Sequence, residues 1–303
     1  MNQVKFENNN EVQVDVKSYV QVNPEFQVKP ELIKSLGDSF KSKENRFALK
    51  INSDKPYFAV RIDGRGFSKF TRRMKFKQYS FLNKELSETM METTKLLMEN
   101  WQASVGYTQS DEITLIFRTE RKQFDGKVQK LVSLIAAQTS VLFNKILSDK
   151  LSENKETNEV RLDILNNMFP LLPIFDCRVI ELDDEKDVVD VLNWRLQDGI
   201  RNSILNLGYF NFNQKELYKL NCKSIQQKLL TEKNIDWNNL SNYEKYGCFF
   251  IRKQVVINEG TDREAVRNKV FRDEELELLQ LIQLSEAGTK TDVVSEKLKL
   301  FLI

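Results

Sequence analysis

The order of the apolar patterns along the chain most constrains its fold. Alternation at 57–63 (YFAVRID) predicts a strand, and 79–101 carries leucine and methionine at helical spacing. Residues 103–119 (ASVGYTQSDEITLIFRT) predict strand, tight turn and strand, 125–148 a second helix, and 175–182 (FDCRVIEL) another strand. This β-α-β-β-α-β order is typical of a ferredoxin-like unit, with two helices on one face of an antiparallel sheet. We therefore predict an α+β fold whose other sheet face is open for function, as in a polymerase palm.

The chain divides into three predicted regions. Residues 1–35 are polar and rich in Asn and Gln, which predicts a flexible N-terminal extension, although alternating valines within it also allow a strand. Residues 36–208 are the predicted palm-like catalytic domain, with a short charged helix at 38–50 and a long helix at 184–207. Residues 209–303 are rich in lysine and are predicted to form a helical C-terminal region.

The composition excludes several kinds of chemistry. The sequence contains no histidine, which removes Ser–His and Cys–His nucleophile pairs and histidine-ligated zinc. Any catalysis must then use carboxylates, Lys, Tyr, Cys or a metal ion held by oxygen. The three cysteines (Cys177, Cys222 and Cys248) are far apart and show no CxxC spacing, so neither a disulfide framework nor a structural zinc site is predicted. A reducing compartment fits this cysteine usage.

No membrane partner is predicted. The sequence has no run of about 18 apolar residues, which a spanning helix needs. Its first thirty residues lack a basic start followed by an apolar run, the pattern of a secretory signal. We therefore expect a cytoplasmic location, with an organelle as the open alternative. The net charge of +2 is too small to indicate a nucleic-acid partner by itself.

Two acidic positions form the predicted catalytic centre. Asp63 ends the first strand and is followed by Gly64, and Ser110-Asp111-Glu112 makes the turn between the second and third strands. Because the first and third strands are central neighbours in this fold, Asp63 and Asp111 can meet at one edge of the sheet. Oxygen ligands at one point suit Mg²⁺. Two such ions would stabilise both oxygens of an in-line phosphoryl displacement.

Asp111 is favoured over Glu112 as a metal ligand, since adjacent side chains in a regular strand point to opposite faces. Glu112 is then a supporting charge. Gly64 lacks a Cβ, so its carbonyl can approach a metal or a phosphate closely. The alternative is that both aspartates are ordinary turn residues. Two exposed acids side by side repel unless a cation joins them, which favours the metal site.

A basic stretch follows the first strand. Between 61 and 77 the chain has seven Lys or Arg residues and one acid, interleaved with Phe67, Phe70 and Phe76. Such cations beside a metal site would hold a triphosphate or an RNA backbone, and the alternative is a solvated face over packed phenylalanines. The seven are Arg61, Arg65, Lys69, Arg72, Arg73, Lys75 and Lys77.

A further polar group lies on the helix at 184–207. It comprises Trp194-Arg195, Asp198 and Arg201-Asn202. By composition alone this spacing is more typical of a helix face that pairs its own charges.

Four ordered motifs carry a resemblance to a known family. They are RIDGRGFSKFTR at 61–72, GYTQSDEITLIF at 106–117, FDCRV at 175–179 and NWRLQDGIRNS at 193–203. With these motifs the chain resembles the tRNA-histidine guanylyltransferase family, and most closely its guanylyltransferase-like branch of 3′-to-5′ polymerases. The resemblance extends from about Leu36 to Val270.

This resemblance implies a polymerase-like palm that adds nucleotides, templated or guanosine alone, to the 5′ end of tRNA. The 5′ end is activated by ATP or already carries a triphosphate, and the 3′-hydroxyl of an incoming nucleotide attacks it. The resemblance thus implies an enzyme, a nucleotidyltransferase, with GTP and ATP as substrates, two Mg²⁺ ions as cofactors and tRNA as partner. It also implies a homotetramer.

Carried over by motif, the metal ligands would be Asp63, the Gly64 carbonyl and Asp111, with Glu112 as a further catalytic residue. Ile200 stands where the histidine-adding branch has a histidine. Ser68 stands where the family often has one, and these departures favour templated repair or editing of 5′ ends over addition of one guanosine. The nucleotide- and tRNA-binding residues would be Arg61, Gly64, Arg65, Gly66, Phe67, Ser68, Arg73, Lys75, Lys77, Ser110, Asp198 and Asn202.

Two other functions share this layout. A nucleotide cyclase also places acids at a hairpin turn of a palm, and it would release a small cyclic product without RNA. A non-catalytic RNA-binding module could use the same sheet, although the aromatic pattern of RNA-recognition strands is absent.

Overall fold

The computed structural model describes residues 30–74, 81–153, 163, 166, 172–257, 265–287 and 291–302. The chain forms two units, Met1–Ala48 and Leu49–Ile303. In the first, α1 spans Pro30–Asn45, so it includes residues 30–35 of the predicted extension. Proline suits a first helical position and an acid such as Glu31 suits the first turn, which favours an early start. The remainder of that prediction lies outside the described residues.

The second unit is built on one six-stranded antiparallel sheet with the order β4-β1-β3-β2-β5-β6. The first and third strands are neighbours at its centre, as predicted, and the α+β palm order is confirmed. The strands are β1 (Tyr57–Arg65), β2 (Val105–Gln109), β3 (Glu112–Arg118), β4 (Ile174–Leu182), β5 (Cys248–Ile257) and β6 (Ala265–Arg272).

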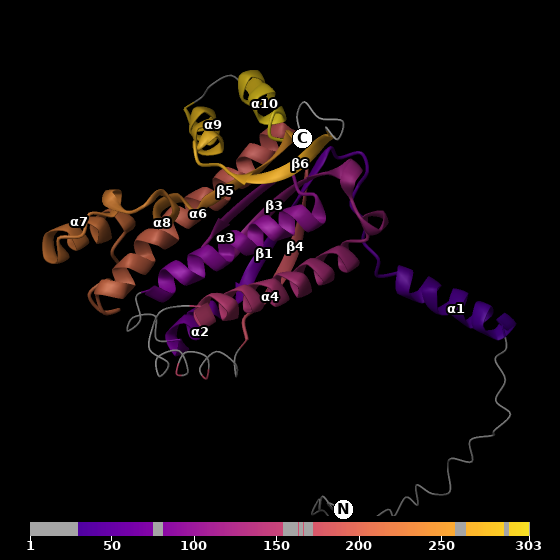
Figure 1. Cartoon of the computed structure of the whole chain (residues 1–303), viewed down its shortest axis with the longest axis horizontal. Helices are drawn as coiled ribbons and strands as arrows, with labels where there is room; N and C mark the ends of the chain where they lie inside the picture. Colours follow the sequence, from indigo (N-terminus) through magenta and orange to yellow (C-terminus); the bar gives the residue numbers. More distant parts are fainter. Residues whose placement is uncertain are drawn as a thin grey trace, which may run out of the picture. The chain divides into compact units, whose positions relative to one another are not determined.

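Three helices cover one face of this sheet: α2 (Phe67–Arg73), α3 (Phe81–Trp101) and α4 (Val128–Glu153). Figure 1 shows α3 and α4 lying side by side across it. Phe67 of the short helix α2 packs against Phe143 and Phe175, with ring centroids 5.4 and 5.2 Å apart. These aromatic contacts fix α2 beside the end of β1, where the predicted catalytic residues lie.

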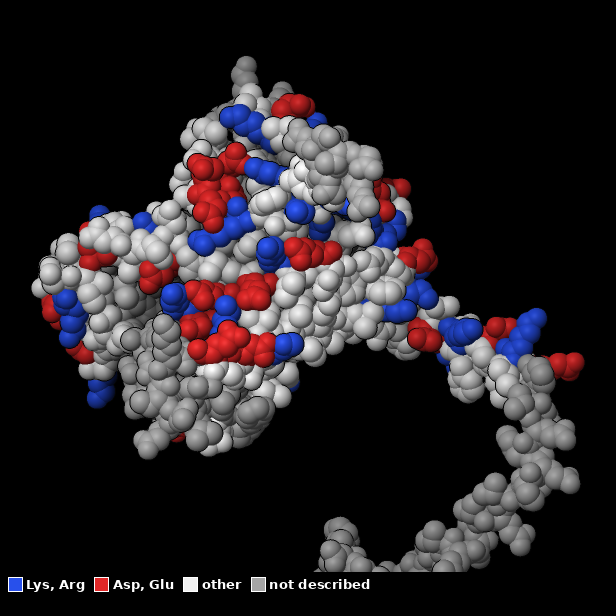
Figure 2. Space-filling model, viewed as in Figure 1, with Lys and Arg blue, Asp and Glu red and all other residues white. Residues whose placement is uncertain are grey.

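Helix α4 is long and apolar enough, by length and composition, to cross a membrane. In the structure Leu131, Ile135 and Phe143 on its inner side are buried in the core. The inner side of α4 is therefore part of the core. The outer side exposes Leu134 and Val141. Figure 2 shows an uncharged surface over one part of α4 and charged side chains over the part nearer α2.

The second face of the sheet is not open over most of its area, contrary to the prediction. Helices α6 (Glu185–Asn211), α9 (Glu277–Glu286) and α10 (Thr291–Lys299) pack on it. The reason is that α6 carries an apolar stripe that includes Leu192 and Leu196. This stripe packs against the residues of β1 and β3 whose side chains point to the second face of the sheet. Arg61 and Asp63 are polar side chains of β1 on this face, and they lie near one end of the strand.

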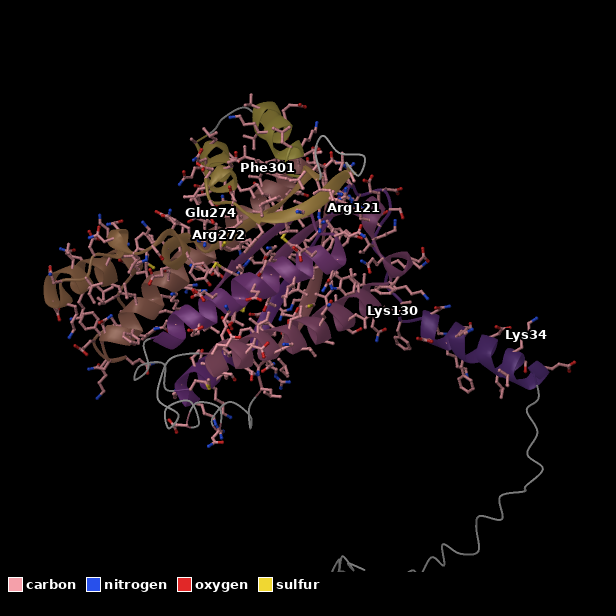
Figure 3. All side chains as sticks on the ribbon, in the orientation of Figure 1. Lys34, Arg121, Lys130, Arg272, Glu274 and Phe301 are labelled. Atoms are coloured by element: carbon pink, nitrogen blue, oxygen red, sulfur yellow. The ribbon has the colours of Figure 1, made fainter. Side chains whose placement is uncertain are left out.

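The C-terminal region is helical only in part. It contains α7 (Cys222–Lys233) and α8 (Asn242–Tyr246), which pack on the end of α6 around a core of their own. Strands β5 and β6 instead extend the central sheet, and the predicted domain boundary at 208/209 falls inside α6. The chain leaves β6 at Arg272 and passes Glu274 toward α9 (Figure 3), and Phe301 returns to the second-face core.

Short 3₁₀ helices lie in the connections between β3 and α4 and between α7 and α8. They are η2 (Thr119–Arg121), η3 (Phe124–Gly126) and η5 (Trp237–Asn239).

Gly199 sets the close approach of α6 to β2, and we predict that Gly199→Ala destabilises the fold. A Cβ there would lie 1.6 Å from Gln109 Oε1 and 2.8 Å from the Tyr107 hydroxyl oxygen, and both residues are buried. Overpacking of this kind costs about 1–3 kcal/mol of unfolding free energy, measurable by urea denaturation. Arg201→Ala, at an exposed position on the same helix, is the control. An unchanged urea midpoint would mean that Gln109 moves aside at no cost.

Candidate active site

The turn between β2 and β3 brings Asp111 against β1. Asp63 and Glu112 are direct cross-strand partners. At the turn Ser110 adopts a left-handed conformation with φ of 53°, and the Asp111 carbonyl accepts a hydrogen bond from the Gly64 N–H at 3.1 Å. Strand β1 continues to Arg65, so Asp63 lies within the strand and not at its end as predicted.

The two aspartates share one electrostatic environment. Burial raises the pKa of Asp111 to about 6, and the charge of Asp63 adds to the rise. A hydrogen bond of 2.9 Å from the Ser110 hydroxyl lowers this pKa and so opposes the rise in part. Burial likewise raises the pKa of Asp63, and the nearby Glu112 charge contributes. Each carboxylate is therefore costly to ionise in the protein alone.

This environment fits a divalent cation, because a positive charge would offset the repulsion and desolvation that raise both pKa values. Gly64 adds to the fit, since a Cβ there would lie 2.9 Å from Asp111 Cβ and 2.3 Å from the Phe67 ring. Among the described residues no three or more Asp, Glu, Cys or His side chains are grouped to hold an ion. The pair would therefore need backbone or substrate oxygens to complete a Mg²⁺ site.

We predict that Asp111→Asn stabilises the Mg²⁺-free protein at pH 8 and that this gain disappears on acidification. A carboxyl whose pKa is raised in the folded state destabilises the fold above that pKa. The penalty is complete above pH 6 and declines as the pH falls from about 6 toward 3.8, the ordinary pKa of an aspartate. Melting temperatures of both proteins at pH 8, 5 and 4, with chelator present, measure it. A gain that grew toward low pH would contradict the assignment.

Two arginines bind the carboxylate of Glu112, one at each oxygen. Arg61 donates to Glu112 Oε1 at 2.9 Å, and Arg195 of α6 donates to Glu112 Oε2. Arg195 is buried and also donates to Asp198 Oδ2 at 2.9 Å. Glu112 thus links strand β3 to helix α6, which accords with a supporting role and not a ligand role.

A cavity of about 890 Å³ opens beside Asp111, between α2, α3, the β2–β3 turn and α6. A smaller cavity of about 320 Å³ adjoins it and reaches Tyr243 and Glu244. Cavities of this size accommodate a nucleotide. The polar lining of the larger one comes from Ser68, Thr71, Arg72, Asn83, Ser87, Ser110, Asp111, Asn202, Asn206 and Gln214.

The sequence-predicted binding residues fall into two groups. Phe67, Ser68, Ser110, Asp111 and Asn202 line the larger cavity, although Phe67 is mainly a core residue. The second group is the ion-pair cluster on the second face, with Arg61, Asp63, Glu112 and Asp198.

The remaining predicted residues do not join either group. Arg65 and Gly66 are exposed where β1 gives way to α2, Gly66 with φ of 71°, and Arg73 is exposed at the end of α2. Lys75 and Lys77 lie outside the described residues.

Sequence reasoning missed the cavity residues of α3 and the C-terminal half of α6. Asn83 and Ser87 are four residues apart on α3, and Asn206 follows Asn202 by four on α6. Pairs of small polar residues at helical spacing beside the apolar stripe were the available signal. Tyr209 and Phe210, both partly exposed, carry the same row onward.

Comparisons with known proteins agree with this geometry. A family model described as tRNAHis guanylyltransferase matches residues 37–183. The chain is 32% identical over 257 residues to the uncharacterized protein R259 of Acanthamoeba polyphaga mimivirus, covering 78% of this chain and 84% of that protein.

Two solved structures are similar over most of the chain. A bacterial tRNA(His) guanylyltransferase-like protein in complex with ATP is 28% identical, with a TM-score of 0.63 over 86% of this chain and 98% of its own. A bacterial protein of the same description in complex with GTP is 25% identical, with a TM-score of 0.58 over 86% and 99% of the two chains.

Proposed function

The chain belongs to the tRNAHis guanylyltransferase family, and from this premise we propose that it adds nucleotides to the 5′ end of tRNA in the 3′-to-5′ direction. The observation that carries the proposal is the position of Asp111. Its carboxylate is coupled electrostatically to Asp63 and lines a nucleotide-sized cavity. The similar structures that contain ATP and GTP support nucleoside triphosphates as its substrates.

In the proposed reaction the 3′-oxygen of an incoming nucleotide bonds to the 5′ phosphorus of the tRNA. Pyrophosphate leaves from a triphosphate end, or AMP leaves from an end activated by ATP. Asp63, Asp111 and the Gly64 carbonyl would hold Mg²⁺, which when bound stabilises charge on the attacking and leaving oxygens. Ser68, Arg72 and Asn202 bind and orient the nucleotide from the cavity walls.

We propose that the addition is templated and not limited to one guanosine. Ile200, where the histidine-adding branch has a histidine, is partly buried against both the second-face core and the α7 core. An apolar packing residue at this point of α6 offers no hydrogen bond to RNA, which supports a wider choice of tRNA.

The test is incubation of a 5′-triphosphorylated tRNA that lacks its first nucleotide with Mg²⁺ and each labelled nucleoside triphosphate in turn. Incorporation only of the nucleotide complementary to the opposing base is expected. Guanosine added whatever the opposing base would overturn templating but keep the family activity. A cyclic product formed without RNA would favour a cyclase, and tRNA binding without incorporation would favour a binding module.

We also propose a homotetramer that acts in the cytoplasm. Exposed Leu134 and Val141 on the outer side of α4 would be covered by assembly, which supports self-association. The three cysteines are free thiols, which supports a reducing compartment. Light scattering of the purified chain and imaging of a tagged copy test the two statements, and a monomer or an organelle location would contradict them.

A further inference from the structure

Trp194 of α6 is an exposed tryptophan beside the candidate active site. Half of its surface, 50%, is accessible to solvent. The other two tryptophans of the chain, Trp101 and Trp237, are each only 7% exposed and pack in cores.

The guanidinium groups of Arg61 and Arg195 both contact the Trp194 ring, and both are held in place by other residues. The guanidinium carbon of Arg195 lies 4.6 Å from the ring centroid and that of Arg61 lies 5.7 Å from it. Both arginines are fixed by the same carboxylate, Glu112. Cation–π contacts to anchored guanidinium groups hold the ring in one orientation, so little ordering cost would be incurred when a ligand stacks on it.

The ring is close to the reacting groups but outside the cavity. Arg61 also reaches Asp63 at 3.5 Å, so the Arg61 side chain contacts both the indole and this aspartate. Trp194 is not among the residues that line either cavity. Along α6 it precedes the cavity residue Asn202 by eight positions, which is about 12 Å at 1.5 Å per residue.

Exposed cations flank this aromatic surface. Arg178 of β4 is the cross-strand partner of Arg61, and 60% of its side chain is exposed. Arg201 follows Trp194 by seven positions on α6, and 65% of its side chain is exposed. Arg178 pairs with Asp176 and Arg201 with Asp198, yet each guanidinium remains mostly exposed. Aromatic rings near exposed guanidinium groups are used by proteins to bind an unpaired base and its neighbouring phosphates.

From these contacts we propose that Trp194 is a stacking platform for an unpaired nucleobase of the RNA substrate, outside the nucleotide cavity. The proposal rests on the proposed function for the identity of the RNA. An unpaired base could also come from a free nucleoside triphosphate, so the test includes both sources.

Tryptophan fluorescence tests the proposal directly, because Trp194 is the exposed indole among three. We expect tRNA with unpaired 3′ nucleotides, and a short single-stranded RNA, to quench the emission. A fully paired RNA hairpin, and ATP or GTP alone, should leave it unchanged. Trp194→Phe should remove the RNA-dependent quenching while tRNA binding, measured by filter retention, persists.

Kinetics supply a second measurement. Trp194→Ala should raise KM for tRNA about tenfold with little change in kcat, and Trp194→Phe should restore most of the loss, as base stacking predicts. Tyr218→Ala, at an aromatic position that is 71% exposed, is the matched control.

Three results would overturn the proposal. The first is an absence of quenching by both RNAs. The second is equal quenching by ATP or GTP alone, which would assign the ring to the free nucleotide. The third is an emission shift that follows protein concentration without RNA, which would assign it to self-association. Because binding and quenching are read without turnover, a failure of the proposed reaction is distinguishable from a failure of Trp194 to stack.

Discussion

Asp63→Asn and Asp111→Asn should each lower kcat/KM for nucleotide addition by about a thousandfold or more. Either change removes a carboxylate from a pair whose pKa values are raised by burial and neighbouring charge, the environment that a cation would relieve. Loss of metal-assisted stabilisation is worth several kcal/mol of barrier, and each 1.36 kcal/mol is a factor of ten in rate. The measurement is incorporation of labelled nucleotide into 5′-triphosphorylated tRNA.

The matched control is Asp125→Asn, the same substitution at an exposed aspartate of η3 that pairs with Lys50. It should leave kcat/KM within about twofold of the original chain, as surface substitutions do. Circular dichroism of all three variants checks that they are folded. If Asp63→Asn or Asp111→Asn retained activity within tenfold of the control, the metal assignment would be wrong.

The sequence was sufficient to predict strands β1 to β4 because their alternation and the helical stripes of α3 and α4 are local patterns. Strands β5 and β6 were missed for a physical reason. Arg252 interrupts the apolar pattern of β5, yet it is buried because it donates to the backbone carbonyls of Ala103 and Met98. Strand β6 is mostly exposed, so it shows little apolar alternation. Only the folded sheet supplies the partners that make these segments strands.

The part of the site formed by the β2–β3 turn beside β1 could be predicted from the sequence. The part formed by the packing of α6 on the sheet could not. The β1–β3 pairing, which the strand order predicts, places Asp63 opposite Glu112 and lets the Gly64 N–H donate to the Asp111 carbonyl in the adjoining turn. Arg195 was predicted to pair with charges of its own helix, and it does contact Asp198. It also reaches Glu112, 83 residues away, because α6 packs across β3. No local pattern contains that partner.

That long-range ion pair leads to the second large effect: Arg195→Met should destabilise the fold by about 3 kcal/mol. Arg195 is only 3% exposed, so the substitution leaves Asp198 without its 2.9 Å partner and Glu112 with Arg61 alone. Removing one partner of a buried ion pair costs about 3–5 kcal/mol, and the partial exposure of the two acids places this case at the lower end. Methionine has a similar volume, so a cavity contributes little.

Arg201→Met is the control that shows how much of the Arg195→Met cost comes from burial and not from loss of a positive charge. Arg201 contacts the same Asp198 at 3.7 Å, but 65% of its side chain is exposed. Exposed pairs are worth about 0–1 kcal/mol, so this variant should unfold at nearly the original urea concentration. The double variant Arg195→Met/Glu112→Gln should lose less unfolding free energy than the sum of the losses of the two single variants. The reason is that neither the arginine nor the glutamate charge is then left without its partner. Equal losses of unfolding free energy for Arg195→Met and Arg201→Met would show that Arg61 alone is sufficient to stabilise the Glu112 carboxylate. The link between β3 and α6 would then come from apolar packing, and Arg195 would be available to the substrate.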